Sequence, residues 1–550
     1  MPQQRGCSSK IRPVWQSQTI PLWLTVTFVT VSLAGCGTPH LKENPRITAL
    51  TKGLNEIEAV SLQEQSLGKP VSVEEGLAKA ATQAAEPNRV APTVTLTLEE
   101  VRAATLANNL DLKVDLIAPA LARETVDIER ARFESVFSGS AEYVGTNPAT
   151  AGAFTSQFYE ASITTPLHTG GAVTASVPVA DRDGVSEAAA SVAVIQSLLR
   201  GAGTEVNTYS LRVATYQQGS VDARTKLAAI ALLADADVTY WRLYAARKAL
   251  DVSRERYKLT ENQLTFAHRM VEAGSAAKIE IVRAEADLAG SLDDVINAET
   301  VVRDWERNLK RIMNRPDLPL HSNVSLIPAT DPAPKGLQLD VEALAVAAVQ
   351  NRLEMIDLEL RLAINDMDIA LAKNNTLPQL DLGYSYLAGG QSRTMGRAFG
   401  EVFDRPSQEH AITLSAAIPL GNQAAEARLR QARLGRIRTQ VDRERQSQQI
   451  RQEVYEVVDA LEQNWRRILA AEQGVGQAFR QYKVEQSQFQ LGKRTSTDVL
   501  LAASNLANAQ LRRISAFADY EVAQVRLAQA TGTILGRAAV QLQPVALTAE

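Results

Sequence analysis

An internal duplication constrains the fold of this chain more than any other feature. Residues 98–111 align with residues 341–354 in a register of about 243 residues, and residues 273–289 align with residues 491–507 in a second register of about 218. The order of the aligned segments is the same in both copies. Each half therefore predicts a short helix, strands, a long helix, a tight turn and a second short helix.

Apolar residues recur every seven positions along the predicted helices, as they do in coiled coils. Two such ladders are Ile281, Leu288, Val295, Val302 and Leu309, and Val454, Leu461, Ile468, Val475, Tyr482 and Phe489. The first long helix has two ladders, Val252, Leu259 and Phe266, and Tyr257, Leu264 and Val271. Two seams on one helix predict a neighbour on each side, as in a sheet or closed tube of helices. A hairpin with one buried seam is the alternative.

The predicted helices fall into two length classes. Residues 206–273 and 426–491 predict helices of roughly 100 Å, at about 1.5 Å per residue. Shorter helices, roughly half as long, are predicted for residues 98–131, 278–313, 341–373 and 498–531. Two short helices stacked end to end would match one long helix.

Between the short and long helices the apolar period changes to two residues, which predicts strands with one apolar and one polar face. The alternation is seen at Leu380, Leu382, Tyr384 and Tyr386, and at Phe137, Gly139, Ala141 and Tyr143. Such strands fit a transmembrane barrel or a water-soluble sandwich. Four strands recur across both halves, whereas a closed barrel needs about eight, so a barrel would require several chains.

The composition favours long helices over an all-β protein or a bundle of membrane-spanning helices. Of the 550 residues, 45% are hydrophobic, 22% are charged and only 5% are aromatic. The net charge of −4 excludes a polycationic nucleic-acid binder. The five histidines are scattered and the sequence carries no catalytic or metal-binding motif, so we expect no enzyme activity, no metal and no cofactor.

The N-terminus has the features of an export signal. Three basic residues precede an apolar stretch, residues 20–33, which ends in Leu33-Ala34-Gly35-Cys36. This ending resembles the lipobox of bacterial lipoproteins. It predicts a signal peptide over residues 1–35 and acylation of Cys36, and a plain signal peptide cleaved nearby is the alternative.

An ordered, duplicated set of motifs covers residues 93–533. It includes Leu96-Thr97-Leu98-Glu99-Glu100, Gln196-Ser197-Leu198-Leu199-Arg200-Gly201, Tyr240-Trp241, Ile418-Pro419-Leu420 and Gly492-Lys493-Arg494-Thr495-Ser496-Thr497-Asp498. The set resembles the outer membrane efflux protein family of TolC-like channels, in a lipoprotein subtype. The resemblance implies an α plus transmembrane β-barrel fold, in which a homotrimer shares a twelve-stranded outer-membrane barrel continued by a long coiled-coil α-helical periplasmic tube.

The predicted organisation comprises a signal peptide (1–35), an acylated tether (36–92), a first repeat (93–314), a Pro-rich crossover (315–338), a second repeat (339–533) and a C-terminal tail (534–550). The first repeat departs from the second in one respect. Residues 157–167 and 172–180 predict an additional hairpin, joined through His168-Thr169-Gly170-Gly171. We expect this hairpin to be extracellular, and added barrel strands are the alternative.

The turns between long and short helices are candidate functional sites, because the resemblance places the periplasmic entrance of the channel at these tips. It implies an aromatic position at Phe489, a basic gate residue at Arg494, an acidic ring at Asp498 and, at Glu280, the acid that partners the base. Gly274 and Gly492 are expected to supply left-handed backbone at the turns. The alternative is that these residues only cap and pack the helix ends.

The sequence and the resemblance together predict a lipid-anchored channel of the cell outer membrane with a periplasmic extension, which passively conducts small molecules. The implied partners are two further copies of the chain, outer-membrane lipid, a periplasmic adaptor and an inner-membrane RND, ABC or MFS transporter. A type I protein secretion channel is the alternative within the family. A lipid-anchored coiled-coil scaffold without a pore is the alternative from another class.

Overall fold

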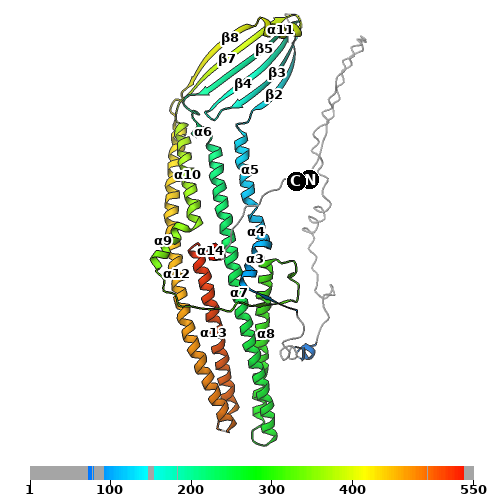
Figure 1. Cartoon of the computed structure of the whole chain (residues 1–550), viewed down its shortest axis with the longest axis vertical. Coiled ribbons are helices and arrows are strands. Elements are labelled where there is room, and N and C mark those ends of the chain that lie inside the picture. Colours follow the sequence, from blue (N-terminus) through cyan, green and yellow to red (C-terminus); the bar gives the residue numbers. More distant parts are fainter. Residues whose placement is uncertain are drawn as a thin grey trace, which may run out of the picture. The chain divides into compact units, whose positions relative to one another are not determined.

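The computed structural model in Figure 1 describes residues 72–76, 78–79, 92–146, 154–182, 184–491 and 493–537. The chain divides into two units, Met1–Gly76 and Leu77–Glu550, and every element described below belongs to the second unit. The predicted signal peptide, the lipidation residue Cys36 and most of the tether lie outside the described residues, as does Gly492.

Two long and two shorter helices form a pair of hairpins. In the first hairpin α7 (Tyr209–Glu272) is followed by α8 (Ile279–Met313), and in the second α12 (Gln423–Gln490) is followed by α13 (Ser496–Ala530). The long helices have 64 and 68 residues and the shorter ones 35 each. These four helices and their two length classes, predicted from the sequence, are confirmed, with bounds that differ by a few residues.

The remaining helices are interrupted where continuous ones were predicted. The first repeat has α3 (Leu98–Asn108), α4 (Leu110–Asp115) and α5 (Ala118–Ala131), and the second has α9 (Val341–Asn351) and α10 (Leu353–Asn374). The breaks at Asn109 and Arg352 fall on aligned positions of the duplication, and both residues have extended backbone. Asn109 Oδ1 accepts from the Leu112 amide at 3.0 Å and caps the new helix, and its Nδ2 donates to the Ile312 carbonyl at 2.9 Å.

The helices of the second unit form one layer of four columns. Both α10 and α13 pack against α7 and against α12, and both α5 and α8 pack against α7. Figure 1 shows α10 and α13 side by side with successive lengths of α12, and α5 and α8 with successive lengths of α7. The columns are therefore α5 with α8, then α7, then α10 with α13, then α12. This arrangement confirms the predicted end-to-end stacking and the second seam of α7.

The predicted ladders form the interior seams of this layer. Val454, Leu461 and Ile468 of α12 are 0%, 3% and 3% exposed, and Val295, Val302 and Leu309 of α8 are equally buried. Near the joint of the columns, Tyr240 of α7 donates its hydroxyl to the Leu96 carbonyl at 3.1 Å and accepts from the Thr330 amide at 2.8 Å. These bonds hold a small parallel sheet of β1 (Thr93–Leu96) and β6 (Ser325–Pro328) against α7.

A second sheet of six antiparallel strands continues from the helices. Its spatial order is β2-β3-β4-β5-β7-β8. The strands are β2 (Val136–Thr146), β3 (Phe154–Pro166), β4 (Gly171–Arg182), β5 (Val185–Ser197), β7 (Gln379–Ser392) and β8 (Ser407–Ala417). β2 follows α5 and β8 precedes α12, so the two edge strands connect to the two outer columns of the helix layer.

The position predicted for the additional hairpin is wrong. The predicted segments are β3 and β4, which lie inside the sheet between β2 and β5 and so are additional strands of that sheet. Their connecting turn lies at the helix end of the sheet, where the Gly203 amide donates to the Thr169 carbonyl at 3.0 Å and His168 stacks on Phe133 at 4.1 Å. This sheet of the described chain therefore has six strands and not the four that recur in both repeats.

Three short helices complete the described elements: α6 (Thr204–Asn207), α11 (Met395–Asp404) and α14 (Ile534–Arg537). Ala398 and Val402 of α11 pack on Val179, Ala188 and Ala388, on the apolar face of the sheet. Across the described parts of the chain, every helix is too short or too polar to span a membrane.

Candidate functional site

The tip of the first hairpin turns through Gly274. Its φ is +71°, in the left-handed region that glycine adopts without a steric penalty. The Ser275 amide donates to the Met270 carbonyl at 2.8 Å, and the Gly274 amide donates to the Val271 carbonyl at 3.0 Å. These bonds satisfy carbonyls that the end of α7 leaves free.

The tip of the second hairpin is closed by a capping box at the start of α13. Thr495 Oγ1 accepts from the Asp498 amide at 3.3 Å, and the Thr495 amide donates to Asp498 Oδ2 at 3.0 Å. The hydrogen bond from the Thr495 backbone amide, assisted by the Thr495 hydroxyl, lowers the pKa of Asp498 below its ordinary value. Asp498 thus caps α13 within its own chain, and this role does not depend on the predicted acidic ring.

The predicted gate base and acid have separate partners within the chain. Arg494 Nε lies 3.2 Å from Glu485 Oε2 and donates to Gln488 Oε1 at 3.2 Å, so both partners belong to the last turns of α12. Glu280 Oε1 lies 2.8 Å from Arg283 on its own helix. The sequence did not indicate Glu485 as a partner, because a spacing of nine residues across a turn has no regular pattern.

Phe489 lies where the two hairpins meet. Its ring is 5.1 Å from that of Phe266 on α7, at an interplanar angle of 58°. Gln263 Nε2 donates to Ser496 Oγ at 2.6 Å in the same region. Phe266 belongs to a predicted ladder, whereas the Gln263–Ser496 bond joins residues 233 positions apart and had no sequence signal. The tips of one chain are thus joined to each other by an aromatic and a polar contact.

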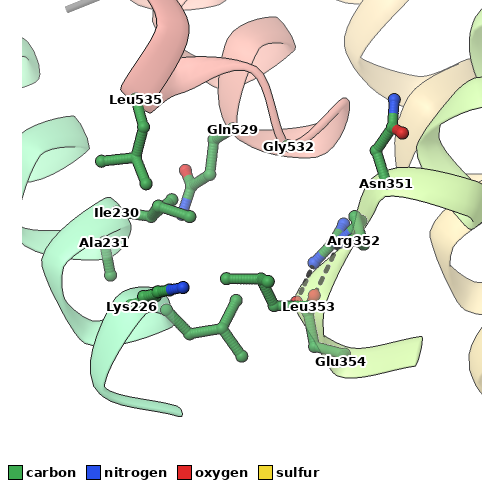
Figure 2. Close-up of a pocket in the computed structure, with 11 residues that line it drawn as sticks. Lys226, Ile230, Ala231, Asn351, Arg352, Leu353, Glu354, Gln529, Gly532 and Leu535 are labelled. Carbon is green, nitrogen blue, oxygen red and sulfur yellow. Dashed lines mark hydrogen bonds and ion pairs between the residues drawn. The ribbon is translucent and has the colours of Figure 1, made fainter. Parts of the chain in front are cut away.

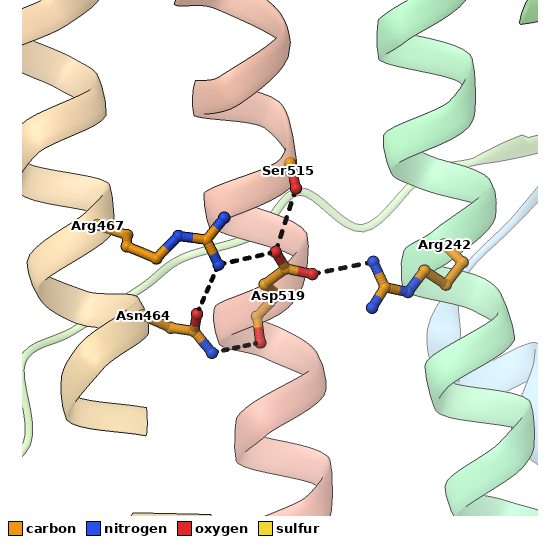
Figure 3. Close-up of polar contacts among 5 residues, drawn as sticks. All are labelled: Arg242, Asn464, Arg467, Ser515 and Asp519. Atoms are coloured by element: carbon orange, nitrogen blue, oxygen red, sulfur yellow. Dashed lines mark hydrogen bonds and ion pairs between the residues drawn. The ribbon is translucent and has the colours of Figure 1, made fainter. Parts of the chain in front are cut away.

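A carboxylate of the helix layer, farther from the tips, joins three helices (Figure 3). Asp519 of α13 lies 2.9 Å from Arg242 of α7 and 3.2 Å from Arg467 of α12, and it accepts from Ser515 Oγ at 3.1 Å. Asn464 Nδ2 donates to the Asp519 carbonyl at 3.4 Å. These residues form the Asp519 cluster, which ties α7 of the first repeat to both helices of the second hairpin. The sequence did not indicate this cluster.

A cleft of about 730 Å³ lies at the joint between α10 and α13, beside α7 (Figure 2). Lys226 and Ile230 of α7 line it, together with Arg352, Leu353 and Glu354. The pKa of Arg352 is raised above its ordinary value. Burial acts to lower this pKa, but hydrogen bonds to Glu354, at 2.5 Å, and to Glu453 outweigh the effect of burial. Its guanidinium is therefore committed to structural ion pairs at the helix break.

The described residues include no cluster of three His, Cys, Asp or Glu side chains able to hold a metal ion. The arrangement of the tips is one of capping, turn formation and contacts between hairpins.

Comparison with known proteins agrees with this architecture. Residues 344–533 match the family model described as "Outer membrane efflux protein". "Outer membrane protein TolC" of Vibrio cholerae serotype O1 is 24% identical over 299 residues, which cover 54% of this chain and 66% of the relative, slightly less than two thirds of its length.

Solved outer-membrane channels share the fold at low sequence identity. The CmeC channel of Campylobacter jejuni has a TM-score of 0.62 at 15% identity, over 79% of this chain and 85% of that chain. The MtrE channel of Neisseria gonorrhoeae in its open state has a TM-score of 0.59 at 18% identity, over 80% of this chain and 89% of that chain.

The fold is that of outer-membrane channel proteins, and the relatives and solved structures that the chain matches are channels and not enzymes. Within that class, residues 344–533 match the outer membrane efflux protein family, and the chain has the TolC-like fold.

Proposed function

We propose that three copies of this chain form a passive conduit across the outer membrane and periplasm. In this proposal small molecules enter at the helical tips from an inner-membrane pump of the RND, ABC or MFS type and a periplasmic adaptor. The chain supplies a path and no chemistry. Acylation of Cys36 would anchor each copy in outer-membrane lipid next to the barrel.

The observation that carries this proposal is that the helix layer and the sheet are open along the same two sides. The outer column of α5 and α8 continues into the edge strand β2, and the outer column α12 is preceded by the edge strand β8. Among the described strands, β2 and β8 each have one neighbour only. An edge strand exposes unpaired backbone N–H and C=O groups, which can pair with another chain and cause aggregation. Closure of the sheet into a barrel removes these edges.

Both outer columns also carry apolar ladders that are exposed in the single chain. On α12 the exposed ladder contains Leu434, Val441, Tyr455 and Leu469, spaced by multiples of seven residues, with exposed fractions of 65%, 63%, 38% and 49%. On α4 and α5 it contains Val114, Leu121 and Ile128, exposed by 66%, 64% and 66%. Since coiled-coil seams pair with seams, α12 of one copy fits α4 and α5 of the next. Three copies would supply twelve columns.

The proposal is tested by purification and electrophysiology. The chain is expected to require detergent, to run as a heat-labile trimer and to give discrete conductance steps in planar bilayers. A Leu434→Glu, Val441→Glu double variant should be monomeric, because charges replace the seam, whereas the control Gln452→Glu, at an exposed position of the same helix, should remain trimeric. A wild-type chain that is monomeric in detergent, together with a Cys36 variant that is soluble without detergent, would support the scaffold instead.

A further inference from the structure

We infer that the hairpin β3–β4 is part of the membrane wall, so that three copies close an eighteen-stranded barrel through pairing of β2 in one copy with β8 in the next. The inference rests on the proposed trimer and goes beyond it. A resemblance to TolC-like channels implies twelve strands, four from each copy, whereas this chain carries six strands in one sheet.

The hairpin shares the face pattern of the strands around it. One row of cross-strand partners comprises Phe137, Ile163, Ala175, Val192, Tyr386 and His410. Phe137, Ile163 and Val192 in this row are exposed, as an apolar face directed at lipid would be in a single copy. Ile163 and Ala175 belong to β3 and β4, so the apolar band runs through the hairpin without interruption.

The opposite face is polar along the adjacent row. Ser138 and Ser162 are cross-strand partners with hydroxyls 2.8 Å apart, and Ser176 and Ser191 repeat the contact at 2.8 Å. Ser162 and Ser176 are partners of each other across the hairpin. A hydroxyl-lined face that is continuous over β2, β3, β4 and β5 is what the wall of a water-filled lumen requires. An extracellular hairpin would have no reason to keep both rows in register.

The directions of the edge strands allow a regular closure. Successive strands of the sheet are antiparallel, and the sheet has an even number of strands, so β2 and β8 run in opposite directions. Pairing β8 of one copy with β2 of the next is therefore antiparallel like every other pair in the sheet. The ring then has no irregular seam.

The width of the sheet also fits the width of the helix layer. Four helix columns, about 8–10 Å apart, cover roughly 32–40 Å of circumference. Six strands about 4.8 Å apart and tilted by about 40° cover about 37 Å, whereas four strands would cover about 25 Å. Six strands per copy thus allow the barrel to continue the tube without tapering. A barrel of eighteen strands leaves an aqueous channel, so the tips and not the membrane end would set the largest solute that passes.

Disulfide trapping in the full-length chain tests the inference. Ser138→Cys on β2 is combined in turn with Ser415→Cys, Thr413→Cys and Ala411→Cys on β8, which lie on the polar face of the sheet. The matched control is Ser162→Cys on β3 with the same β8 positions, because Ser162 is the cross-strand partner of Ser138 but is covered by strands on both sides. Single-cysteine variants measure the background from the native cysteines.

Oxidation of at least one Ser138→Cys pair should give a covalent trimer on a non-reducing gel that dithiothreitol converts back to monomer. The Ser162→Cys pairs should stay monomeric under the same denaturing conditions. Cross-linking through Ser162→Cys, closure at another number of copies, or a trimer in which no Ser138→Cys pair reacts would overturn the eighteen-stranded barrel and leave the conduit standing. A chain that is monomeric in detergent would overturn both.

Discussion

Thr495 and Asp498 fix the start of α13 through reciprocal hydrogen bonds, and this arrangement explains the acid at the second tip without any gate. The two interpretations of Asp498 are compatible, because a carboxylate that caps its helix still carries a negative charge toward solvent. The lowered pKa keeps that charge throughout the neutral and mildly acidic range.

Loss of the cap should expose the first turn of α13. Thr495→Ala is expected to lower the local stability of the α13 N-terminus by about 1 kcal/mol, because it removes the side-chain acceptor for the Asp498 amide. Hydrogen exchange of the first-turn amides measures this loss. Thr300→Ala is the control, since the Thr300 hydroxyl bonds only to a carbonyl within α8. Equal exchange in both variants would argue against a capping role.

The same cap predicts a specific pH dependence. Because folding lowers the pKa of Asp498, the stabilisation by its carboxylate is fully present above its ordinary pKa of 3.8 and is lost as the pH falls through the lower folded value. First-turn protection should therefore be constant from pH 8 to about pH 5 and decline only in stronger acid. A decline centred near pH 6 would point to another group. The control is Asp498→Asn, which should remove the acid-dependent step.

Arg494 tests the proposed closed entrance. Arg494→Ala removes the contacts that tie the tip to Glu485 and Gln488 in the last turns of α12, and it removes a positive charge that three copies would place around the aperture. We expect a higher single-channel conductance in planar bilayers than for the parent chain. Arg513→Ala, which removes an ion pair to Glu472 away from the tip, should leave conductance unchanged. If Arg494→Ala also leaves it unchanged, the tip residues only cap and pack.

At the scale of elements, an aromatic contact and an ion-pair cluster join the two hairpins of one chain at two places along their length, in addition to the packing of α13 on α7. Phe266 and Phe489 meet near the tips, and the Asp519 cluster joins α7, α12 and α13 farther toward the sheet. If the hairpins moved apart at the tips, the Phe266–Phe489 contact would separate before the Asp519 cluster, which lies nearer the sheet. The Asp519 cluster is thus a candidate pivot for any opening of the entrance.

Asp519→Asn should weaken the connection between the hairpins. The substitution removes the charge that neutralises Arg242 and Arg467, and we expect a loss of about 1 kcal/mol in stability. A double-mutant cycle of Arg242→Ala with Asp519→Asn isolates the coupling, expected at about 0.5–1 kcal/mol. Asp442→Asn, whose ion pair to Arg445 lies within one helix, is the control. Additive effects of the two substitutions would show that the cluster does not couple the hairpins.

The elements could be predicted from the sequence to the extent that a period defines them. Ladders of seven located α7, α8 and α12, and alternation of two located the strands. The breaks at Asn109 and Arg352 were missed, because helical sequence resumes directly after both and Arg352 lacks the side-chain cap that Asn109 provides. The place of β3 and β4 was also missed, because alternating faces look the same in an exposed hairpin and in a wall. Pairing partners decide between these arrangements, and they are far apart in sequence.

At the scale of the whole molecule, the second unit leaves apolar seams and sheet edges uncovered. Its seams Leu434–Leu469 and Val114–Ile128 and its edge strands β2 and β8 are all uncovered. The resemblance gave the expectation of a channel, and the family and fold comparisons agree with it. The Asp519 cluster and the link between Gln263 and Ser496 could not be foreseen, since isolated polar residues on helices carry no periodic signal.

The opposite directions of β2 and β8 have a consequence for how such a wall can change size. A single inserted strand would leave like-directed edges facing each other at each junction between copies, so the sheet can grow only by pairs. In a threefold ring every inserted pair is present three times, and the strand number changes in steps of six. In the proposed barrel the diameter of the membrane end can therefore change only in discrete steps, each set by one added or removed hairpin per copy.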